Sequence, residues 1–195
     1  MVSEHGKAGR PRSEQARAAI LHAVDDLLVD VGYGAVTLKG IAERAGVSRQ
    51  TIYRWWSTKA EVLLEASAID ARQELDIAPQ DGPVAEITAY LDALRTFLTN
   101  SDAGAAYRAL LGEAQHDSAV RELLLSSDPI GDSAATVLSR ALPDDVLALP
   151  RSRAVSSLVG PTFFWVLSGR DPAALNTHDL ALEFIRTAAP SHASD

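Results

Sequence analysis

The feature that most constrains this chain is a four-residue turn, Ala45-Gly46-Val47-Ser48, which separates two short segments of helical character. Gly46 can adopt the left-handed conformation that ends a helix. Ser48 can begin the next helix, because its hydroxyl accepts hydrogen bonds from the first free amides. Val47 is placed to fill the angle between the two helices. This combination predicts a helix-turn-helix motif.

Positive charge is concentrated around the motif. Residues 37–59 hold five Lys or Arg side chains and one acidic side chain, although the whole chain has a formal charge of −8. Residues 1–59 hold nine basic and six acidic side chains, whereas residues 60–195 hold nine basic and twenty acidic ones. A basic patch at one end of an acidic protein can dock on phosphates, because binding releases counterions from the duplex. Double-stranded DNA is therefore the predicted partner.

The second helix of the motif is expected to bury Ile52, which turns Gln50 and Arg54 outward toward a DNA groove. Arg and Gln suit paired hydrogen bonds to guanine and adenine, although on most protein surfaces they are only solvated. The predicted DNA-binding residues are Thr37, Lys39, Ser48, Arg49, Gln50, Thr51, Tyr53, Arg54, Trp55 and Lys59.

Three aromatic side chains, Tyr53, Trp55 and Trp56, lie at the end of this helix. Aromatic residues serve packing more often than recognition. Trp56 is assigned to the core. Tyr53 and Trp55 are predicted to face phosphates because they flank Arg54 in a basic setting, with burial as the alternative for both.

Helical periodicity continues along the whole chain, and no segment alternates apolar and polar residues for long enough to predict a strand. The fold is therefore predicted to be all-α. Helices are expected at about 13–31, 37–45, 48–55, 58–77, 84–100, 104–115, 118–126, 129–141, 151–168 and 177–188. The segment Gly9-Arg10-Pro11-Arg12 suits a narrow minor groove, so residues 1–12 are expected to form a flexible arm that enters it, with a disordered basic tail as the alternative.

Composition excludes several classes of site. The chain has no cysteine, so it forms no disulfide and no thiolate metal site. The N-terminal segment has no apolar signal region, and no apolar stretch reaches membrane-spanning length. A cytoplasmic protein is expected.

Two His-Asp pairs, His116-Asp117 and His178-Asp179, are the only hint of metal chemistry. Both stand where helices are expected to begin, and such residues are more often helix caps or solvated side chains than metal ligands. The sequence contains no G-x-S-x-G, Walker loop or H-E-x-x-H motif. We expect no enzymatic activity, no catalytic residues, no bound metal and no cofactor.

Residues 20–66 resemble the N-terminal domain of TetR/AcrR-type transcriptional regulators. The matching positions are Gly32-Tyr33, Thr37, Ile41-Ala42, Ala45-Gly46-Val47-Ser48, Thr51-Ile52-Tyr53 and Lys59. The resemblance implies phosphate contacts for Thr37, Ser48, Tyr53 and Lys59, and positions around the bases for Arg49, Gln50, Thr51 and Arg54. Trp55-Trp56 stands where the family more usually has a His-Phe pair.

Residues 107–115 and 158–164 are similar to one subgroup of the family's C-terminal regulatory domain. The resemblance implies about nine helices, a homodimer built on the last two, and usually a cavity for a small effector. It also implies a repressor rather than an activator. Pro161 would then lie as a kink inside the penultimate helix.

The apolar residues of the body permit two interpretations. The candidate effector-cavity residues are Tyr90, Phe97, Tyr107, Phe163, Phe164 and Trp165, which would equally fill a helical core. The candidate dimer-interface residues are Val155, Leu158, Val159, Thr162, Val166, Leu182, Ile185 and Ala189, which would equally be buried within one chain.

The sequence thus predicts a ligand-responsive repressor that binds an inverted-repeat operator as a homodimer and is released by a small apolar or amphipathic effector. Residues 13–58 are expected to form the DNA-binding domain, and residues 59–195 the ligand-binding and dimerisation domain. The alternative is a helical protein-interaction module whose basic end docks an acidic partner. A steep salt dependence with preference for one duplex sequence would distinguish the two.

Overall fold

The computed structural model of the protein describes residues 9–189, and within this range it contains ten α-helices, one 3-10 turn and no strand. The all-α prediction is confirmed, and the ten helices are close to the number implied by the resemblance. In chain order the elements are α1 (Gly9–Ala35), α2 (Leu38–Arg44), α3 (Arg49–Tyr53), α4 (Lys59–Glu74), α5 (Pro83–Asn100), α6 (Asp102–Glu113), α7 (Ser118–Ser126), α8 (Pro129–Ala141), α9 (Arg151–Leu167), η1 (Pro172–Ala174) and α10 (Thr177–Ala188).

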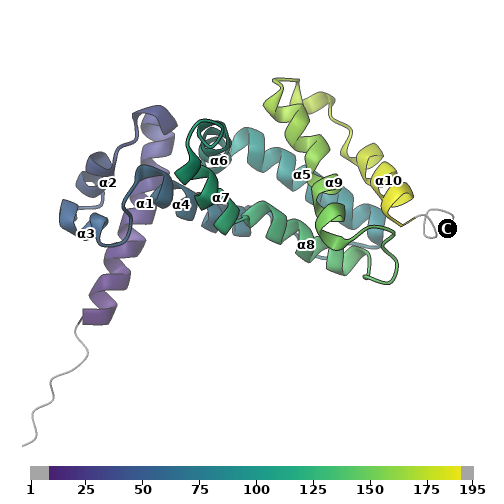
Figure 1. Ribbon diagram of the computed structural model, residues 1–195, viewed down its shortest axis with the longest axis horizontal. Coiled ribbons are helices and arrows are strands. Elements are labelled where there is room, and N and C mark those ends of the chain that lie inside the picture. The colour runs from purple at the N-terminus through teal and green to yellow at the C-terminus, as the bar shows by residue number, and fades with distance from the viewer. Residues whose placement is uncertain (1–8, 190–195) are drawn as a thin grey trace, which may run out of the picture.

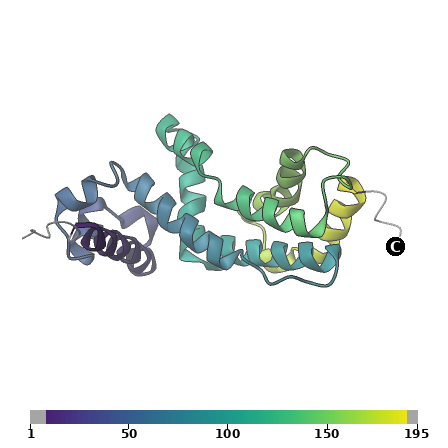
Figure 2. The ribbon, with the colours of Figure 1, turned by 90° about the horizontal axis from the view of Figure 1, so that it is seen from below.

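The helices form an elongated molecule (Figures 1 and 2). Helices α1 to α3 pack together at one end, and α5, α8, α9 and α10 form the other (Figure 1). Between them, α4 runs from the first group toward the second and packs against α6, which also contacts α1. No helix in the described range is long and apolar enough to cross a membrane.

Helix α1 differs from expectation at its start. It begins at Gly9, so the backbone of residues 9–12, expected to be part of a flexible arm, is helical. A proline in the first turn is compatible with this, because the first helical amides have no partner within the helix. Residues 1–8, the rest of the expected arm, lie outside the described residues. Near its other end α1 is interrupted at Gly32, whose φ of 71° and ψ of 164° produce the predicted break.

Short polar side chains set the starts of the next three helices. The hydroxyl of Thr37 accepts from Gly40 N at 3.0 Å, and the hydroxyls of Ser48 and Thr58 cap α3 and α4 in the same way. Gly46 takes a φ of 65°, as the predicted turn requires. The helix-turn-helix geometry is therefore built from local capping signals.

Helix α5 is the centre of the body and packs against α6, α8, α9 and α10. In this packing most of the predicted effector-cavity residues fill the core or lie partly covered. Tyr90, Phe97 and Tyr107 are buried in the core, Phe163 and Trp165 are half-buried, and Phe164 is exposed. Tyr90 donates its hydroxyl hydrogen bond to Ile130 O or Ser133 Oγ, which lie 3.2 and 2.9 Å away. Pockets of about 510, 350, 230 and 170 Å³ among the described residues are lined by other side chains.

The same packing corrects the predicted dimer face. Five of its eight residues are buried within the single chain, because the apolar faces of α9 and α10 turn toward α5: Leu158, Thr162, Val166, Ile185 and Ala189. Val155 and Val159 are half-buried, and Leu182 is exposed. Helix α9 continues through Pro161, as predicted.

Acidic side chains meet where α1 lies against α4. Asp25 of α1 and Asp70 of α4 line a groove of about 350 Å³, and Asp25 Oδ1 is buried without a hydrogen-bond partner among the described residues. Burial raises the pKa of Asp25 to about 6, with the charge of Asp70 adding to the rise and His22 opposing it. Folding therefore favours the protonated form of this carboxyl group.

We expect Asp25→Asn to stabilise the protein at neutral pH. A carboxyl pKa raised from 3.8 to about 6 means that the folded chain holds a proton that the unfolded chain releases in this window, so the free energy of unfolding falls as pH rises through it. Removing the carboxyl group should raise the free energy of unfolding by about 1 kcal/mol at pH 7.5, allowing for solvent screening of a half-buried site. Urea unfolding at pH 4.5 and 7.5 measures this.

Asp30→Asn is the matched control on the same helix. Asp30 accepts a hydrogen bond from Arg44 Nη2 at 2.6 Å, so its loss should give no gain in stability. An Asp25→Asn variant that keeps the wild-type dependence of unfolding free energy on pH would contradict the assignment.

Candidate nucleic-acid interface

Helix α3 presents the side chains that the sequence assigned to base recognition. Ile52 is fully buried, as predicted, and anchors the helix to the core. Arg49 and Gln50 are exposed, and neither side chain forms a hydrogen bond or ion pair within the described part of the chain. Tyr53 is 56% exposed. These three side chains are available to a ligand outside the protein.

The N-terminus of α3 is held by two hydroxyl groups. Ser48 Oγ accepts from Thr51 N at 3.2 Å, and the hydroxyls of Ser48 and Thr51 lie 2.9 Å apart. Ser48 is exposed and Thr51 is half-buried. The cap fixes the direction of the helix start and leaves the Ser48 hydroxyl at the surface.

Two cations of the basic segment differ in their availability. Arg44 is engaged by α1, since its guanidinium contacts Asp30 at 2.6 Å and Asp26 at 3.5 Å. Lys39 is exposed, and its one ion pair among the described residues is with Glu43, at 3.7 Å along its own helix. Surface pairs of the second kind are weak, so Lys39 remains available for phosphate and Arg44 does not.

The phosphate contact predicted for Trp55 is contradicted by the structure. Its ring is half-buried against the core, and its Nε1 atom is buried without an acceptor among residues 9–189. Nε1 is the only hydrogen-bond donor of the side chain, so Trp55 has no donor to offer a phosphate. Trp56 is buried, as predicted.

Arg54 is exposed but is already held in place. Its Nη2 donates to Ser13 Oγ at 3.1 Å, and its guanidinium carbon lies 5.4 Å from the centre of the Trp55 ring. The sequence places Ser13 at the expected start of the first helix and gives it no role at this interface. Arg17, which also contacts Trp55, was not identified at all. The signal that could have found it is its spacing of four residues from Ser13, which places both side chains on one face of α1.

Lys59 lies at the junction with the body. Its Nζ is 4.2 Å from the centre of the Tyr33 ring and 3.4 Å from Tyr33 O. The Tyr33 hydroxyl in turn donates to a Glu113 carboxylate oxygen on α6. Burial, together with this hydrogen bond, raises the pKa of Tyr33 well above its usual value. Tyr33 therefore links a predicted phosphate contact to the body.

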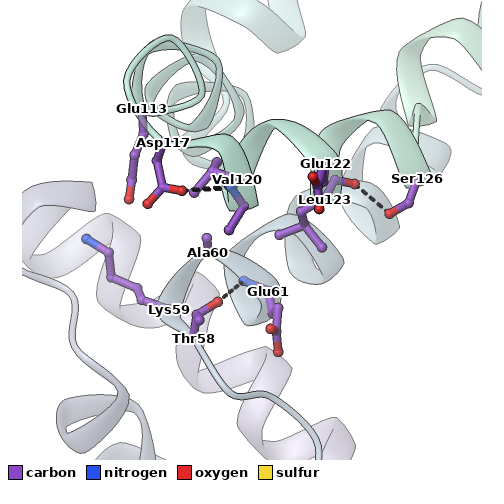
Figure 3. A pocket seen from close by; sticks show the side chains of 11 residues that line it. Thr58, Lys59, Ala60, Glu61, Glu113, Asp117, Val120, Glu122, Leu123 and Ser126 are labelled. Atoms are coloured by element: carbon purple, nitrogen blue, oxygen red, sulfur yellow. Dashed lines mark hydrogen bonds between the residues drawn. The ribbon is translucent and has the colours of Figure 1, made fainter.

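A pocket of about 510 Å³ opens beside Lys59 (Figure 3). Side chains from α4 form one wall, and side chains from α6 and α7 form the other. Asp117, predicted as a helix cap, accepts from Ala119 N at 2.8 Å and begins α7 on this wall. In the described part of the chain no group of three or more His, Cys, Asp or Glu side chains is arranged to hold a metal ion.

Comparison with known proteins places this arrangement in a family. The sequence profile of bacterial regulatory proteins of the tetR family matches residues 20–66. The uncharacterized HTH-type transcriptional regulator YdeS of Bacillus subtilis (strain 168) is 40% identical over 116 residues, which are 60% of this chain and 58% of YdeS. The chain thus spans little more than half the length of YdeS.

Two further proteins are similar over more of their length. The HTH-type transcriptional regulator AlkX of Mycobacterium tuberculosis (strain ATCC 25618 / H37Rv) is 30% identical over 146 residues, 71% of this chain and 69% of AlkX. The crystal structure of the TetR family transcription regulator SCO0332 superposes with a TM-score of 0.73 at 24% identity, covering 88% of this chain and 96% of that one.

These similarities bear on several predictions at once. The fold is that of TetR-family proteins, with the helix-turn-helix at the N-terminal end. The related proteins are transcription regulators, which confirms the prediction that the chain is not an enzyme. With a matching helix-turn-helix profile and a relative covered over two thirds of its length, the chain belongs to the tetR family of bacterial regulatory proteins.

Proposed function

We infer that this protein is a homodimeric repressor that binds an inverted-repeat operator in the cytoplasm and is released by a small molecule. The exposed start of α3 carries the proposal, because Arg49 and Gln50 stand there without partners among the described residues. A recognition helix in the major groove offers such side chains to base edges. We assign residues 13–58 to DNA binding and residues 59–195 to effector binding and dimerisation.

Selection from a pool of randomised duplexes tests the DNA-binding proposal. One helix-turn-helix per chain in a two-fold dimer should recover an inverted repeat with half-sites about 34–36 Å apart. Arg49→Ala should relax the preference at one base pair in each half-site. Recovery of single half-sites bound by monomers would contradict the inverted-repeat operator. Recovery of no preferred duplex would contradict sequence-specific DNA binding as a whole.

An exposed apolar surface on the last two long helices supports the homodimer. Phe164 and Leu167 of α9 are 66% and 52% exposed, and Leu182 of α10 is 38% exposed. Gly160, on the same helix as Phe164, would let a second helix approach closely. Helices α9 and α10 pack against one another, so the residues belong to one end of the molecule (Figure 1).

We expect Phe164→Glu to dissociate the dimer. A charge placed in a desolvated apolar contact costs several kcal/mol, and two-fold symmetry places the substitution in the interface twice. Analytical ultracentrifugation at micromolar concentration measures the change in mass. Leu125→Glu is the matched control, because Leu125 is 79% exposed on α7, away from this surface. If Phe164→Glu remains a dimer, the interface lies elsewhere.

The effector proposal concerns the body. We infer that a small apolar or amphipathic molecule binds among α5 to α8, and that the packed core around Tyr90 rearranges to admit it. These contacts connect the body to the DNA-binding end: α6 carries Glu113, which accepts from Tyr33, and Tyr33 lies against Lys59. A ligand that moves α6 would alter these contacts.

Linkage makes the effector proposal testable. Operator DNA must weaken effector binding by the factor with which the effector weakens DNA binding, typically about 1–3 kcal/mol of coupling. Calorimetric titration of a compound found by thermal-shift screening, with and without operator, measures both affinities. Equal affinities in the two titrations would refute the coupling.

A further inference from the structure

Arg17 of α1 connects three parts of the DNA-binding end. Its guanidinium forms an ion pair with Glu65 of α4. The guanidinium carbon lies 5.7 Å from the centre of the Trp55 ring and 6.0 Å from that of Trp56. One side chain therefore joins α1, the segment that follows α3, and α4.

Glu65 holds the other side of this arrangement. One carboxylate oxygen pairs with Arg17, and the other accepts from Trp56 Nε1 at 2.9 Å. The Trp55 and Trp56 ring centres are 6.2 Å apart, with their planes at 38°. Arginine suits such a site because its planar guanidinium stacks on aromatic rings while it pairs with a carboxylate. We name these four residues, Arg17, Trp55, Trp56 and Glu65, the Arg17 cluster.

Trp55 also contacts a second guanidinium, that of Arg54. The Arg54 guanidinium carbon lies 5.4 Å from the Trp55 ring centre, and Nη2 donates to Ser13 Oγ at 3.1 Å. A guanidinium has five N–H donors, and Ser13 takes one of them. Arg54 forms no ion pair with any residue that the structure describes. It is thus ordered by its neighbours and still able to donate to DNA.

We propose that Arg17 is a positioning residue that, through Trp55, holds Arg54 in the orientation in which Arg54 distinguishes one base pair of the operator. The proposal rests on the proposed DNA-binding function. It also gives a role to Trp55, whose donor is buried.

The physical basis is preorganisation. A free arginine side chain loses much rotamer freedom when it binds a base edge, and ordering it beforehand reduces that loss for every sequence. A fixed orientation also lets the correct base accept a paired hydrogen bond while other bases leave donors unpaired. Removing the contacts that hold Arg54 should therefore reduce the difference in affinity between the operator and a duplex with one substituted base pair. The affinity for non-specific DNA should fall less.

The experiment measures discrimination rather than affinity alone. The full-length protein is titrated with its selected operator and with duplexes that carry one substituted base pair per half-site. Discrimination is the ratio of the affinity for the operator to that for a substituted duplex. At the base pair where Arg54→Ala abolishes discrimination, Arg17→Met and Arg17→Lys should each reduce this ratio about tenfold. In an Arg54→Ala background neither Arg17 variant should reduce it further, because the two residues act as a unit. Arg17→Lys keeps the charge, so its loss of discrimination separates stacking from simple attraction.

Tryptophan fluorescence supplies a second readout. The chain has three tryptophans, so a Trp165→Phe background leaves only the indoles of Trp55 and Trp56. Arg17→Met in this background should shift their emission to longer wavelength and speed acrylamide quenching, because Trp55 loses its cover. Lys39→Gln is the matched control: it removes one cation from α2, should weaken all duplexes about equally, and should leave the emission unchanged.

The outcomes separate the possible roles. Arg17 variants that discriminate as the wild type does would overturn the proposal, as would a uniform loss of affinity with a shallower salt dependence, which is the signature of a phosphate contact. A wild-type protein that selects no duplex would instead overturn the DNA-binding function on which the proposal rests. If Arg17→Met does not fold, Ser13→Ala carries the test. That variant removes only the acceptor of Arg54, and unchanged discrimination at the Arg54 base pair would count against positioning.

Discussion

Raising the salt concentration from 50 to 200 mM is expected to weaken operator binding about 10³-fold. The estimate assumes about six neutralised phosphates per dimer, for which the logarithm of the affinity falls with a slope of roughly −0.9 per phosphate on the logarithm of salt concentration. Lys39, Arg49 and Lys59 are the cations of each chain that we expect to neutralise phosphates, with Arg54 assigned to a base pair. Fluorescence anisotropy of a labelled operator across this range measures the slope.

Two charge variants locate the effect. Lys39→Gln should reduce the slope by about two for the dimer, because each chain loses one available cation. Arg44→Gln should leave the slope unchanged, since Arg44 already contacts Asp26 and Asp30. A shallow slope in the wild type, with no preference among duplexes, would favour a protein-interaction module that docks an acidic partner.

The local structure of the DNA-binding end could be predicted from the sequence. Thr37, Ser48 and Thr58 each accept a hydrogen bond from the amide three residues ahead, and Gly46 supplies the left-handed turn. These signals act over a few residues, so a pattern in the chain predicts them directly. The order of the helices follows for the same reason, because breaks and caps punctuate the whole sequence.

The packing partners of the apolar helix faces could not be predicted from the sequence. Leu158 and Ile185 lie on stripes that suit either a neighbouring helix of the same chain or a second chain, and only the position of α5 decides between them. Trp55 shows the same limit at the interface with DNA. The ion pair that completes its surroundings joins Arg17 to Glu65, 48 residues apart. Periodicity specifies which face of a helix is apolar and not what covers it.

Gly104→Ala is expected to lower the free energy of unfolding by about 3 kcal/mol, through steric conflict between α5 and α6. An ideal Cβ at Gly104 would overlap the carbonyl oxygen of Phe97 and lie 2.7 Å from its carbonyl carbon. Both atoms belong to the backbone of α5, so no side-chain rotation relieves the contact, and the two helices must separate. Urea denaturation followed by circular dichroism measures the loss.

Gly112→Ala, on the same helix, should act in the opposite direction. No atom of the residues that the structure describes lies within 4 Å of the Cβ position at Gly112, and the residue is exposed. Alanine there should stabilise α6 by about 0.5–1 kcal/mol, because it restricts the unfolded chain without a new contact in the folded one. A Gly104→Ala variant that unfolds at the wild-type urea midpoint would show that α5 and α6 are not packed backbone to backbone. Helix α6 also carries Glu113, which accepts a hydrogen bond from Tyr33. If α5 does not hold α6 in place, the fixed position of Glu113 would need another explanation.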